Sequence, residues 1–438
     1  MKYFGTDGIR QPADQFTQNF IISIIEGLVD YSSDSIKVLI AGDTRESTEW
    51  ILADLEVALE TFGVEYSNAG VLPTPAINYC FYQMGFDFAI DVTASHNPYT
   101  DNGIKIFERG EKSGQKLSPK GCEIIEEKLS LQKSYTPASP SLRESIHQEA
   151  LDLYREHLLN YIGECDFRNL KIGLDCANGA TSVINKTIFE QLGAKVELIH
   201  SDDNYNTKIN HECGSTHLNS LRDIVVNNHL DFGIAFDGDG DRCMFINESG
   251  EEIDGDYTIA ILADYLNLET IATTVMVNQG LLNWAKEKDI KVEITAVGDA
   301  NVKAAMDEKH IELGGEQSGH IILPNEPTGD GMLTSLMITK IISEKSKSLK
   351  ELTSNITKSP QVIVNLSATP EQKKSLTTKA AVKKLLEEYD EKLKSISGRL
   401  LVRPSGTEPL IRITMWGNDE EAITTLANDL KDELGEIL

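Results

Sequence analysis

The first third of the chain alternates short apolar runs with segments of helical periodicity. A β-branched apolar run at 36–41 ends at Gly42-Asp43, and a helical pattern follows at 48–61. The next expected elements are a strand at 64–71, a helix that opens at Pro75 and a strand at 86–92. Such alternation is typical of βαβ units and predicts a mainly parallel sheet.

This pattern restarts twice further along the chain. The second cycle predicts strands at 170–174, 195–199 and 232–236, with helices at 182–192 and 221–230. The third cycle begins after Gly255 and predicts a helix from Tyr257, a strand at 274–277, a helix at 281–288 and a strand at 292–296. We therefore expect three α/β domains of similar size.

The tail follows a different pattern and predicts a small α+β domain. Its expected elements are a strand at 362–366, a helix at 373–389, strands at 399–402 and 411–416, and a helix at 420–434. Polar stretches at 134–145 and 344–359 separate the cycles. The predicted domains are residues 1–145, 146–253, 254–358 and 359–438.

Length and charge narrow the choice of partners. At 438 residues the chain exceeds the roughly 250–300 residues that one compact core supports. Lys plus Arg number 41 and Asp plus Glu 69, so the net charge of −28 disfavours nucleic acid and anionic membranes as partners. To bind an anionic small-molecule substrate, this acidic protein would need to concentrate positive charge locally, in a few arginines.

The six cysteines form no CxxC pair. We expect buried or half-buried free thiols rather than disulfides or zinc ligands. The N-terminus lacks a long apolar segment, and no stretch approaches the roughly 20 apolar residues that cross a bilayer. These features predict a cytoplasmic protein.

Thr93-Ala94-Ser95-His96-Asn97-Pro98 follows directly on the strand that ends at Val92. Open α/β sheets place their sites in loops at strand C-termini, so Ser95 is a candidate nucleophile there. Lys105 follows ten residues later and could return to this loop as a cation or an acid–base group. A strand-exit turn is the alternative, because Ser, Asn and Pro are turn residues.

The acidic loop Asp237-Gly238-Asp239-Gly240-Asp241 places three carboxylates at alternate positions. The glycines let the backbone curl, so the carboxylates can converge on one hard cation such as Mg²⁺. A calcium EF-hand is the alternative, and Glu248 stands in its twelfth position. Arg242 stands where an EF-hand turn requires Gly, and the flanking segments are predicted strands, so Mg²⁺ is favoured.

Two further loops are candidate ligand-binding segments. In Gly314-Gly315-Glu316-Gln317-Ser318-Gly319-His320, Glu316 and Ser318 could bind sugar hydroxyls, although by itself a turn between strands is the simpler interpretation. Arg403-Pro404-Ser405-Gly406-Thr407-Glu408-Pro409, with Arg412 beyond it, offers an arginine fork, hydroxyls and backbone amides that suit a phosphate. It is not a Walker A loop, because it lacks the GK[ST] sequence.

These four segments, preceded by Gly5-Thr6-Asp7-Gly8-Ile9-Arg10, occur in an order and at spacings that resemble the α-D-phosphohexomutase family over nearly the whole chain. The resemblance implies three α/β domains with mixed sheets and a small C-terminal α+β domain around a central cleft. It also implies that each domain contributes one motif.

The resemblance implies roles for individual residues at the reacting end of the site. Ser95 matches the serine that carries the transferable phosphoryl group, His96 and Asn97 match its neighbours, and Lys105 and Arg10 match groups near the reacting phosphate. The implied cofactor is one Mg²⁺ per chain. Its implied ligands are Ser95, Asp237, Asp239 and Asp241.

The resemblance likewise implies roles at the substrate. The residues expected to contact the sugar phosphate are Arg242, Glu316, Ser318 and His320. The residues expected to hold the non-reacting phosphate are Arg403, Ser405, Gly406, Thr407 and Arg412.

The resemblance implies isomerisation of a hexosamine phosphate by phosphoryl transfer from phospho-Ser95, through a bound 1,6-bisphosphate. The product would feed amino-sugar nucleotide and cell-wall precursor synthesis. Two sequence features resemble the hexosamine branch of the family: the segment Asp175-Cys176-Ala177-Asn178-Gly179-Ala180 and Gln317. Two positions depart from it, because Gln11 replaces a typical Gly and Ala300 replaces a typical Arg. Alternatives are a mutase for glucose or mannose phosphates, a serine-nucleophile phosphatase and an inactive sugar-phosphate sensor. The protein is expected to be a monomer or a homodimer.

Overall fold

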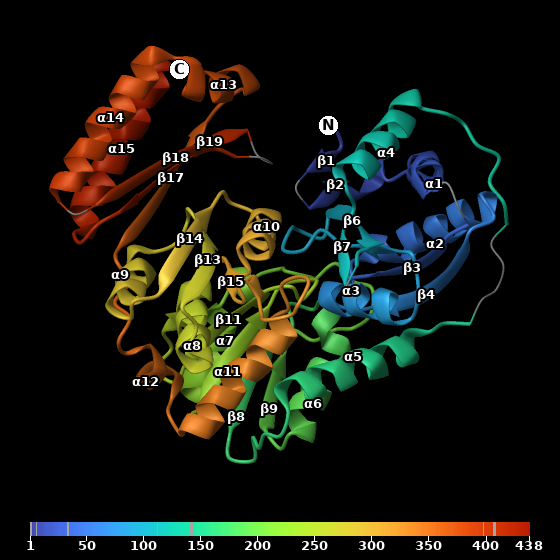
Figure 1. Ribbon diagram of the computed structural model, residues 1–438, viewed down its shortest axis with the longest axis horizontal. Coiled ribbons are helices and arrows are strands. Elements are labelled where there is room, and N and C mark those ends of the chain that lie inside the picture. The colour runs from blue at the N-terminus through green and yellow to red at the C-terminus, as the bar shows by residue number, and fades with distance from the viewer. Residues whose placement is uncertain are drawn as a thin grey trace. The chain divides into compact units, whose positions relative to one another are not determined.

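The computed structural model describes residues 2–5, 7–32, 35–111, 113–139, 144–396, 398–405 and 409–438. Two compact units divide the chain: Met1–Thr274 with Lys291–Ser354, and Val275–Ile290 with Asn355–Leu438. Figure 1 labels their helices and strands. None of the described helices is long and apolar enough to cross a bilayer.

The first unit begins with a mixed sheet in which the order of the main strands is β1-β2-β6-β5-β3-β4, with β7 on β6. Strand β3 is parallel to β4 and β5, and β6 is antiparallel to β5 and β2. The strands are β1 (Phe4–Gly5), β2 (Gly8–Pro12), β3 (Lys37–Gly42), β4 (Glu65–Val71), β5 (Phe88–Val92), β6 (Asp101–Arg109) and β7 (Gly114–Lys116). The helices are α1 (Gln18–Ser32), α2 (Glu46–Thr61), α3 (Thr74–Gln83) and α4 (Pro119–Leu131). Every residue of β5 is buried, as expected for a central strand covered on both faces.

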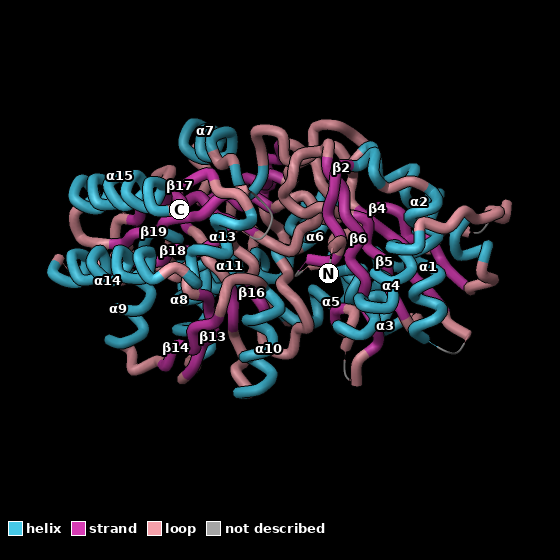
Figure 2. Tube along the Cα trace, turned by 90° about the horizontal axis from the view of Figure 1, so that it is seen from above, coloured by secondary structure: helices cyan, strands magenta, loops and turns pink. Residues whose placement is uncertain are grey.

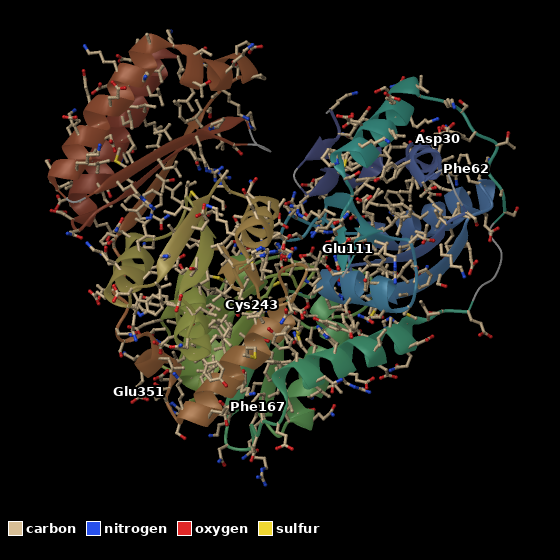
Figure 3. The ribbon with its side chains drawn as sticks, viewed as in Figure 1. Asp30, Phe62, Glu111, Phe167, Cys243 and Glu351 are labelled. Atoms are coloured by element: carbon tan, nitrogen blue, oxygen red, sulfur yellow. The ribbon has the colours of Figure 1, made fainter. Side chains whose placement is uncertain are left out.

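A second mixed sheet of this unit has the order β12-β11-β10-β8-β9. Strands β8, β9 and β10 are parallel, and β11 runs antiparallel to β10. The strands are β8 (Lys171–Asp175), β9 (Lys195–Ile199), β10 (Phe232–Phe236), β11 (Cys243–Asn247) and β12 (Glu252–Ile253). The helices are α5 (His147–Ile162), α6 (Asn185–Gln191) and α7 (Asn219–Asn227). Phe167 and Cys243, labelled in Figure 3, are fully buried in this unit.

The third sheet has the order β14-β13-β15-β16. Its strands are β13 (Thr270–Thr274), β14 (Lys291–Thr295), β15 (Gly314–Gly315) and β16 (Ile321–Ile322). The helices are α8 (Gly255–Leu266), α10 (Asp299–Lys309), α11 (Gly331–Lys345) and α12 (Leu349–Thr353). The sequence prediction of a strand at 274–277 is wrong, because the strand occupies Thr270–Thr274 and the chain then enters α9 (Gln279–Glu287).

The C-terminal unit is built on the antiparallel sheet β17-β19-β18. Its strands are β17 (Gln361–Ser367), β18 (Arg399–Pro404) and β19 (Leu410–Trp416). Helix α13 is Pro370–Thr378, and helices α14 (Ala380–Ser395) and α15 (Glu420–Ile437) lie side by side against the sheet (Figure 1, Figure 2). The predicted α/β architecture with mixed sheets and an α+β C-terminal part is confirmed.

Candidate active site

Ser95 lies three residues beyond the end of β5 and is fully buried. Its backbone adopts a positive φ of 53°, an uncommon conformation for a residue other than glycine. The Oγ donates a hydrogen bond of 2.7 Å to Oδ2 of Asp237, and the Ser95 amide donates to Oγ1 of Thr93 over 2.9 Å. The turn therefore directs the hydroxyl at the acidic loop.

Arg45 is fully buried and forms hydrogen bonds with the backbone of the Ser95 loop. Its guanidinium donates to the backbone carbonyl oxygens of Ser95 at 2.8 Å, Asn97 at 2.9 Å and Pro98 at 2.6 Å. Its Nε donates to Oδ2 of Asp43 over 2.9 Å, so the buried charge is paired. A planar fork with five donors suits this arrangement of carbonyls.

The three aspartates of the acidic loop converge after β10. One carboxylate oxygen from each of Asp237, Asp239 and Asp241 lies within 4.8 Å of the other two. Within the described part of the chain, Oδ1 of Asp239 and Oδ1 of Asp241 are buried and accept no hydrogen bond. Buried carboxylate oxygens without donors are ligands for a hard cation, so these residues fit a bound divalent metal.

Charge in the acidic loop is unevenly balanced. Burial and repulsion from Asp239 and Asp241 raise the pKa of Asp237 well above its ordinary value. Burial alone would also raise the pKa of Asp241, but Lys105 and His320 hold it well below the usual range. The repulsion at Asp237 is what a cation between the carboxylates would relieve.

Lys105 reaches the same carboxylates from β6. Its Nζ lies 2.7 Å from Oδ2 of Asp239, 3.5 Å from Oδ2 of Asp241 and 3.2 Å from Oδ2 of Asp7. Burial pulls the pKa of Lys105 down, but the surrounding carboxylates raise it well above its ordinary value. The side chain of Lys105 is therefore an ammonium group in contact with the acidic loop.

Asp7 forms ion pairs with three cationic side chains, those of Arg10, Lys105 and Lys116. Arg10 donates to Oδ2 of Asp7 over 2.7 Å, and Lys116 donates to Oδ1 over 2.6 Å. Although burial alone would raise it, the pKa of Asp7 is held well below its ordinary value by Lys105, Lys116 and Arg10. Lys116 also donates to Oδ2 of Asp299 at the start of α10, over 2.6 Å.

His96 and Arg242 flank the serine. Nδ1 of His96 lies 3.4 Å from Oγ of Ser95 and 3.3 Å from a guanidinium nitrogen of Arg242. Burial, together with the charges of Arg242 and Arg10, lowers the pKa of His96 to about 4. His96 is therefore neutral near pH 7, and its Nδ1 can accept a hydrogen bond.

The predicted sugar loop lies between β15 and β16. Glu316 is half-buried, and its Oε1 accepts from the Gly298 amide over 3.1 Å, whereas Ser318 is exposed. His320 is buried, with Nδ1 3.5 Å from Oδ2 of Asp241 and Nε2 accepting from the Gly329 amide over 3.1 Å. The structure thus places His320 against the acidic loop.

The predicted phosphate loop belongs to the C-terminal unit. Arg403 and Arg412 are cross-strand partners on the antiparallel pair β18 and β19. The carbonyl of Ser405 accepts from Nζ of Lys373 over 2.7 Å. Gly406 and Thr407 lie outside the described residues.

Sequence reasoning missed Arg45 and Lys116 as parts of the site. A signal for Arg45 was present, because it lies three residues after β3, at the same sheet edge as Ser95. No local pattern distinguishes Lys116 from a surface lysine, because its two carboxylate partners are about a hundred residues or more away in sequence.

Comparison with known proteins identifies the family to which these features belong. The phosphoglucomutase/phosphomannomutase models for alpha/beta/alpha domains I, II and III match residues 1–135, 152–250 and 254–359. The model for the C-terminal domain of the same family matches residues 364–433. Together the four models account for most of the chain.

Individual relatives agree with this match. A phosphoglucosamine mutase from Caldicellulosiruptor saccharolyticus is 40% identical over 444 aligned positions, covering 98% of each chain. The crystal structure of a phosphoglucomutase/phosphomannomutase family protein from Burkholderia thailandensis superposes with a TM-score of 0.77 at 21% identity, over 98% of this chain and 96% of that one. N-acetylphosphoglucosamine mutase from Aspergillus fumigatus, solved with GlcNAc-6P and magnesium, gives a TM-score of 0.70 at 15% identity, over 99% and 95%. The two structural matches show a shared fold.

Proposed function

Because the chain belongs to the phosphoglucomutase/phosphomannomutase family and is a phosphohexose mutase, we propose that it interconverts glucosamine 6-phosphate and glucosamine 1-phosphate through phospho-Ser95. The observation that carries the proposal is the 2.7 Å contact between Oγ of Ser95 and Oδ2 of Asp237. It places a buried hydroxyl directly on the carboxylates of a cation site. The choice of sugar is supported by the full-length similarity to a phosphoglucosamine mutase.

The proposed cycle is balanced without any added reagent. Phospho-Ser95 transfers its phosphoryl group to the free hydroxyl of the sugar phosphate, so the bond from phosphorus to Oγ breaks and a bond to the sugar oxygen forms. The bound product is the 1,6-bisphosphate; the sugar hydroxyl releases one proton, Oγ of Ser95 takes up one, and the return transfer reverses this exchange. The bisphosphate then reorients, and its other phosphoryl group returns to Ser95.

We propose Mg²⁺ as the cation, held by Ser95, Asp237, Asp239 and Asp241. Two orphaned carboxylate oxygens and the raised pKa of Asp237 support it, and oxygen ligands suit this ion. When bound, Mg²⁺ would supply electrostatic stabilisation of the transferring phosphoryl group.

The protein's own cations add to that stabilisation. Lys105 is held as an ammonium group by three carboxylates, and Asp7 fixes the position of Arg10. Neutral His96, with Nδ1 3.4 Å from Oγ of Ser95, can accept a hydrogen bond from the serine hydroxyl and orient it. Preorganised charge of this kind is the main contribution that phosphoryl transfer needs from a protein.

The proposed sugar contacts come from Arg242, Glu316, Ser318 and His320. The carboxylate of Glu316 is the candidate partner of the 2-ammonium group of the sugar. Its Oε1 accepts from the Gly298 amide, and we assign Oε2 to the sugar. We assign the non-reacting phosphate to Arg403, Ser405 and Arg412, together with Gly406 and Thr407, on the sequence motif alone. We also propose the domain boundaries given above, and a cytoplasmic location that six free thiols support.

Intact-mass measurement tests the covalent step. We expect one phosphate on the wild-type protein, mapped to Ser95, and its loss together with mutase activity in Ser95→Ala. Ser130→Ala, an exposed change on α4, is the matched control and should retain both. A fully active Ser95→Ala protein would refute the mechanism.

A side-by-side measurement of kcat/KM tests the sugar. The kcat/KM for glucosamine 6-phosphate should exceed the values for glucose 1-phosphate and mannose 1-phosphate. If either neutral sugar is preferred by tenfold, about 1.4 kcal/mol in the transition state, the substrate assignment is wrong and the mutase activity stands. Release of free phosphate at the rate of isomerisation would favour a phosphatase instead.

A further inference from the structure

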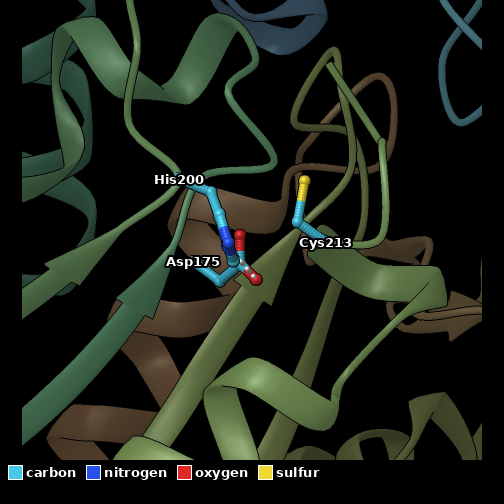
Figure 4. Close-up of side chains that lie close together, drawn as sticks. All are labelled: Asp175, His200 and Cys213. Carbon is cyan, nitrogen blue, oxygen red and sulfur yellow. Dashed lines mark hydrogen bonds and ion pairs between the residues drawn. The ribbon is translucent and has the colours of Figure 1, made fainter. Parts of the chain in front are cut away.

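We propose that Asp175, His200 and Cys213 form a second metal site, which binds one divalent cation of the zinc class and is distinct from the acidic loop. Asp175 is the last residue of β8, and His200 follows the end of the neighbouring parallel strand β9. Cys213 precedes the short turn at Gly214–Thr216. Figure 4 shows the Asp175 carboxylate against the His200 ring, with Cys213 on the adjoining loop.

The three ligand atoms lie near enough to converge on one metal ion after a small movement. One ligand atom from each of the three side chains lies within 4.8 Å of the other two. In a tetrahedral zinc site, nitrogen, oxygen and sulfur ligands lie about 3.3–3.8 Å apart. The widest pair therefore has to approach by no more than about 1.5 Å, a movement that side-chain rotation in a loop can supply.

The Asp175 carboxylate is held in a fixed orientation, and its Oδ2 lies 3.1 Å from Nδ1 of His200. Asp175 is fully buried, and the ion pair that it forms among the described residues is with His200, whose side chain is 31% exposed. Oδ1 of Asp175 accepts from the Ala177 amide at 2.9 Å, and Oδ2 accepts from the Gly214 amide at 3.0 Å. These donors orient the carboxylate as outer-shell groups orient metal ligands.

The surroundings of Cys213 suit a bound thiolate. The thiol is buried, and it would release its proton to solvent when a metal binds, because the thiolate is the ligand. Nδ2 of Asn178 lies 3.9 Å from Sγ and can donate to it. The side chain of His200 is 31% exposed, so this ligand is in contact with solvent. An aspartate, histidine and cysteine set favours zinc over Mg²⁺, which prefers oxygen ligands alone.

The site would fasten the loop that supports the reactive serine. His200 and Cys213 stand at the two ends of the segment 200–213. Inside this segment, Nδ2 of Asn210 donates to the carbonyl of Ser95 over 2.8 Å. A metal that ties both ends of the segment to Asp175 would therefore hold the Asn210 contact in place. This role differs from our sequence-based expectation that all six cysteines are plain thiols.

Cobalt binding tests the proposal with the metal alone as the probe. Chelator-stripped protein is titrated with Co²⁺ in excess Mg²⁺, which occupies the acidic loop. A cobalt–thiolate absorption band should appear in the wild type, persist in Cys176→Ser and disappear in Cys213→Ser. Cys176 is the matched control, because it is a buried thiol directly after Asp175 whose Sγ accepts from Asn185. The acidic loop contains no sulfur and cannot produce this band.

A second measurement covers the case in which Cys213→Ser folds poorly. His200→Gln changes a half-exposed side chain, and we expect it to weaken Zn²⁺ binding by at least roughly tenfold. In excess Mg²⁺, Zn²⁺ should raise the unfolding temperature of the wild type more than that of His200→Gln. Absence of the band in the wild type, its survival in Cys213→Ser, or equal Zn²⁺ affinity of His200→Gln and the wild type would each overturn the proposal.

Discussion

The buried guanidinium of Arg45 donates a 2.8 Å hydrogen bond to the backbone carbonyl of Ser95, the residue three positions beyond the end of a neighbouring strand. Nδ2 of Asn210 donates to the same carbonyl oxygen, also over 2.8 Å. Two donors from separate parts of the first unit thus fix a backbone that stands at positive φ. The strain of the turn is maintained by its surroundings, as is common at functional sites.

We predict that Arg45→Lys impairs turnover and stability together. An ammonium group cannot reach the several carbonyls that the planar fork serves, so buried acceptors lose donors at about 1–3 kcal/mol each. We expect kcat to fall at least roughly tenfold with little change in KM, measured beside urea unfolding.

Arg109→Lys is the matched control for this change. Arg109 also donates to backbone carbonyls, those of Tyr82 and Phe86, but it is exposed. Equal effects of the two substitutions on kcat would contradict a positioning role for Arg45.

We predict that Asp239→Asn abolishes most activity without unfolding the protein. Oδ2 of Asp239 accepts from Lys105 and from Thr74, and an amide oxygen can still accept these bonds. The change removes one of three neighbouring negative charges, so metal binding weakens while repulsion within the loop falls. Calorimetric Mg²⁺ titration and steady-state rates measure the two effects, with the exposed Asp203→Asn as the control. Full activity in excess EDTA would exclude the metal assignment.

We predict that Gly238→Ala disables the site through backbone contact alone. A Cβ at Gly238 would lie 2.6 Å from the carbonyl oxygen of Ser95, closer than real Cβ atoms approach, so one of the two loops must move. A displacement of this kind is expected to lower kcat by about a hundredfold. Gly435→Ala, in α15 with its nearest contact at 3.5 Å, should be stabilising by up to about 1 kcal/mol. A Gly238→Ala protein with wild-type rates would show that the loops are not in fixed contact.

We predict that Asp330 makes stability depend on pH. Burial raises its pKa to about 7, although the Leu333 amide and the Tyr154 hydroxyl both donate to its carboxylate. Between the unfolded value of about 3.9 and about 7, the folded protein binds a proton that the unfolded chain does not. The stabilising contribution is therefore complete at low pH and is lost as pH rises through about 7.

Asp330→Asn tests this, because asparagine can still cap α11 and cannot titrate. The free energy of unfolding should decline less steeply in the variant than in the wild type from about pH 5 to about pH 8. Urea unfolding across this range measures the difference. Parallel pH profiles of the two proteins would refute the assignment.

The sequence by itself determined the family, the order of the motifs and most of the strands. Local patterns suffice for this, because apolar periodicity and turn residues act over a few neighbouring positions. The expected strand at 232–236 agrees with β10, and Ser95 stands at a strand exit as predicted. Where local signals conflict, the prediction fails: a single helix was expected at 373–389, but extended backbone at Lys379 divides it into α13 and α14.

Only the tertiary structure decided which distant residues meet. The pairing of β5 with β3 brings Arg45 within hydrogen-bonding distance of Ser95, and its pairing with β6 places Lys105 opposite Asp91. Local periodicity does not predict this strand order. The same holds for Lys116 between Asp7 and Asp299, and for His200 beside Asp175. Long-range pairing depends on the packing of whole sheets, so the chemistry of each loop could be predicted from sequence while its partners could not.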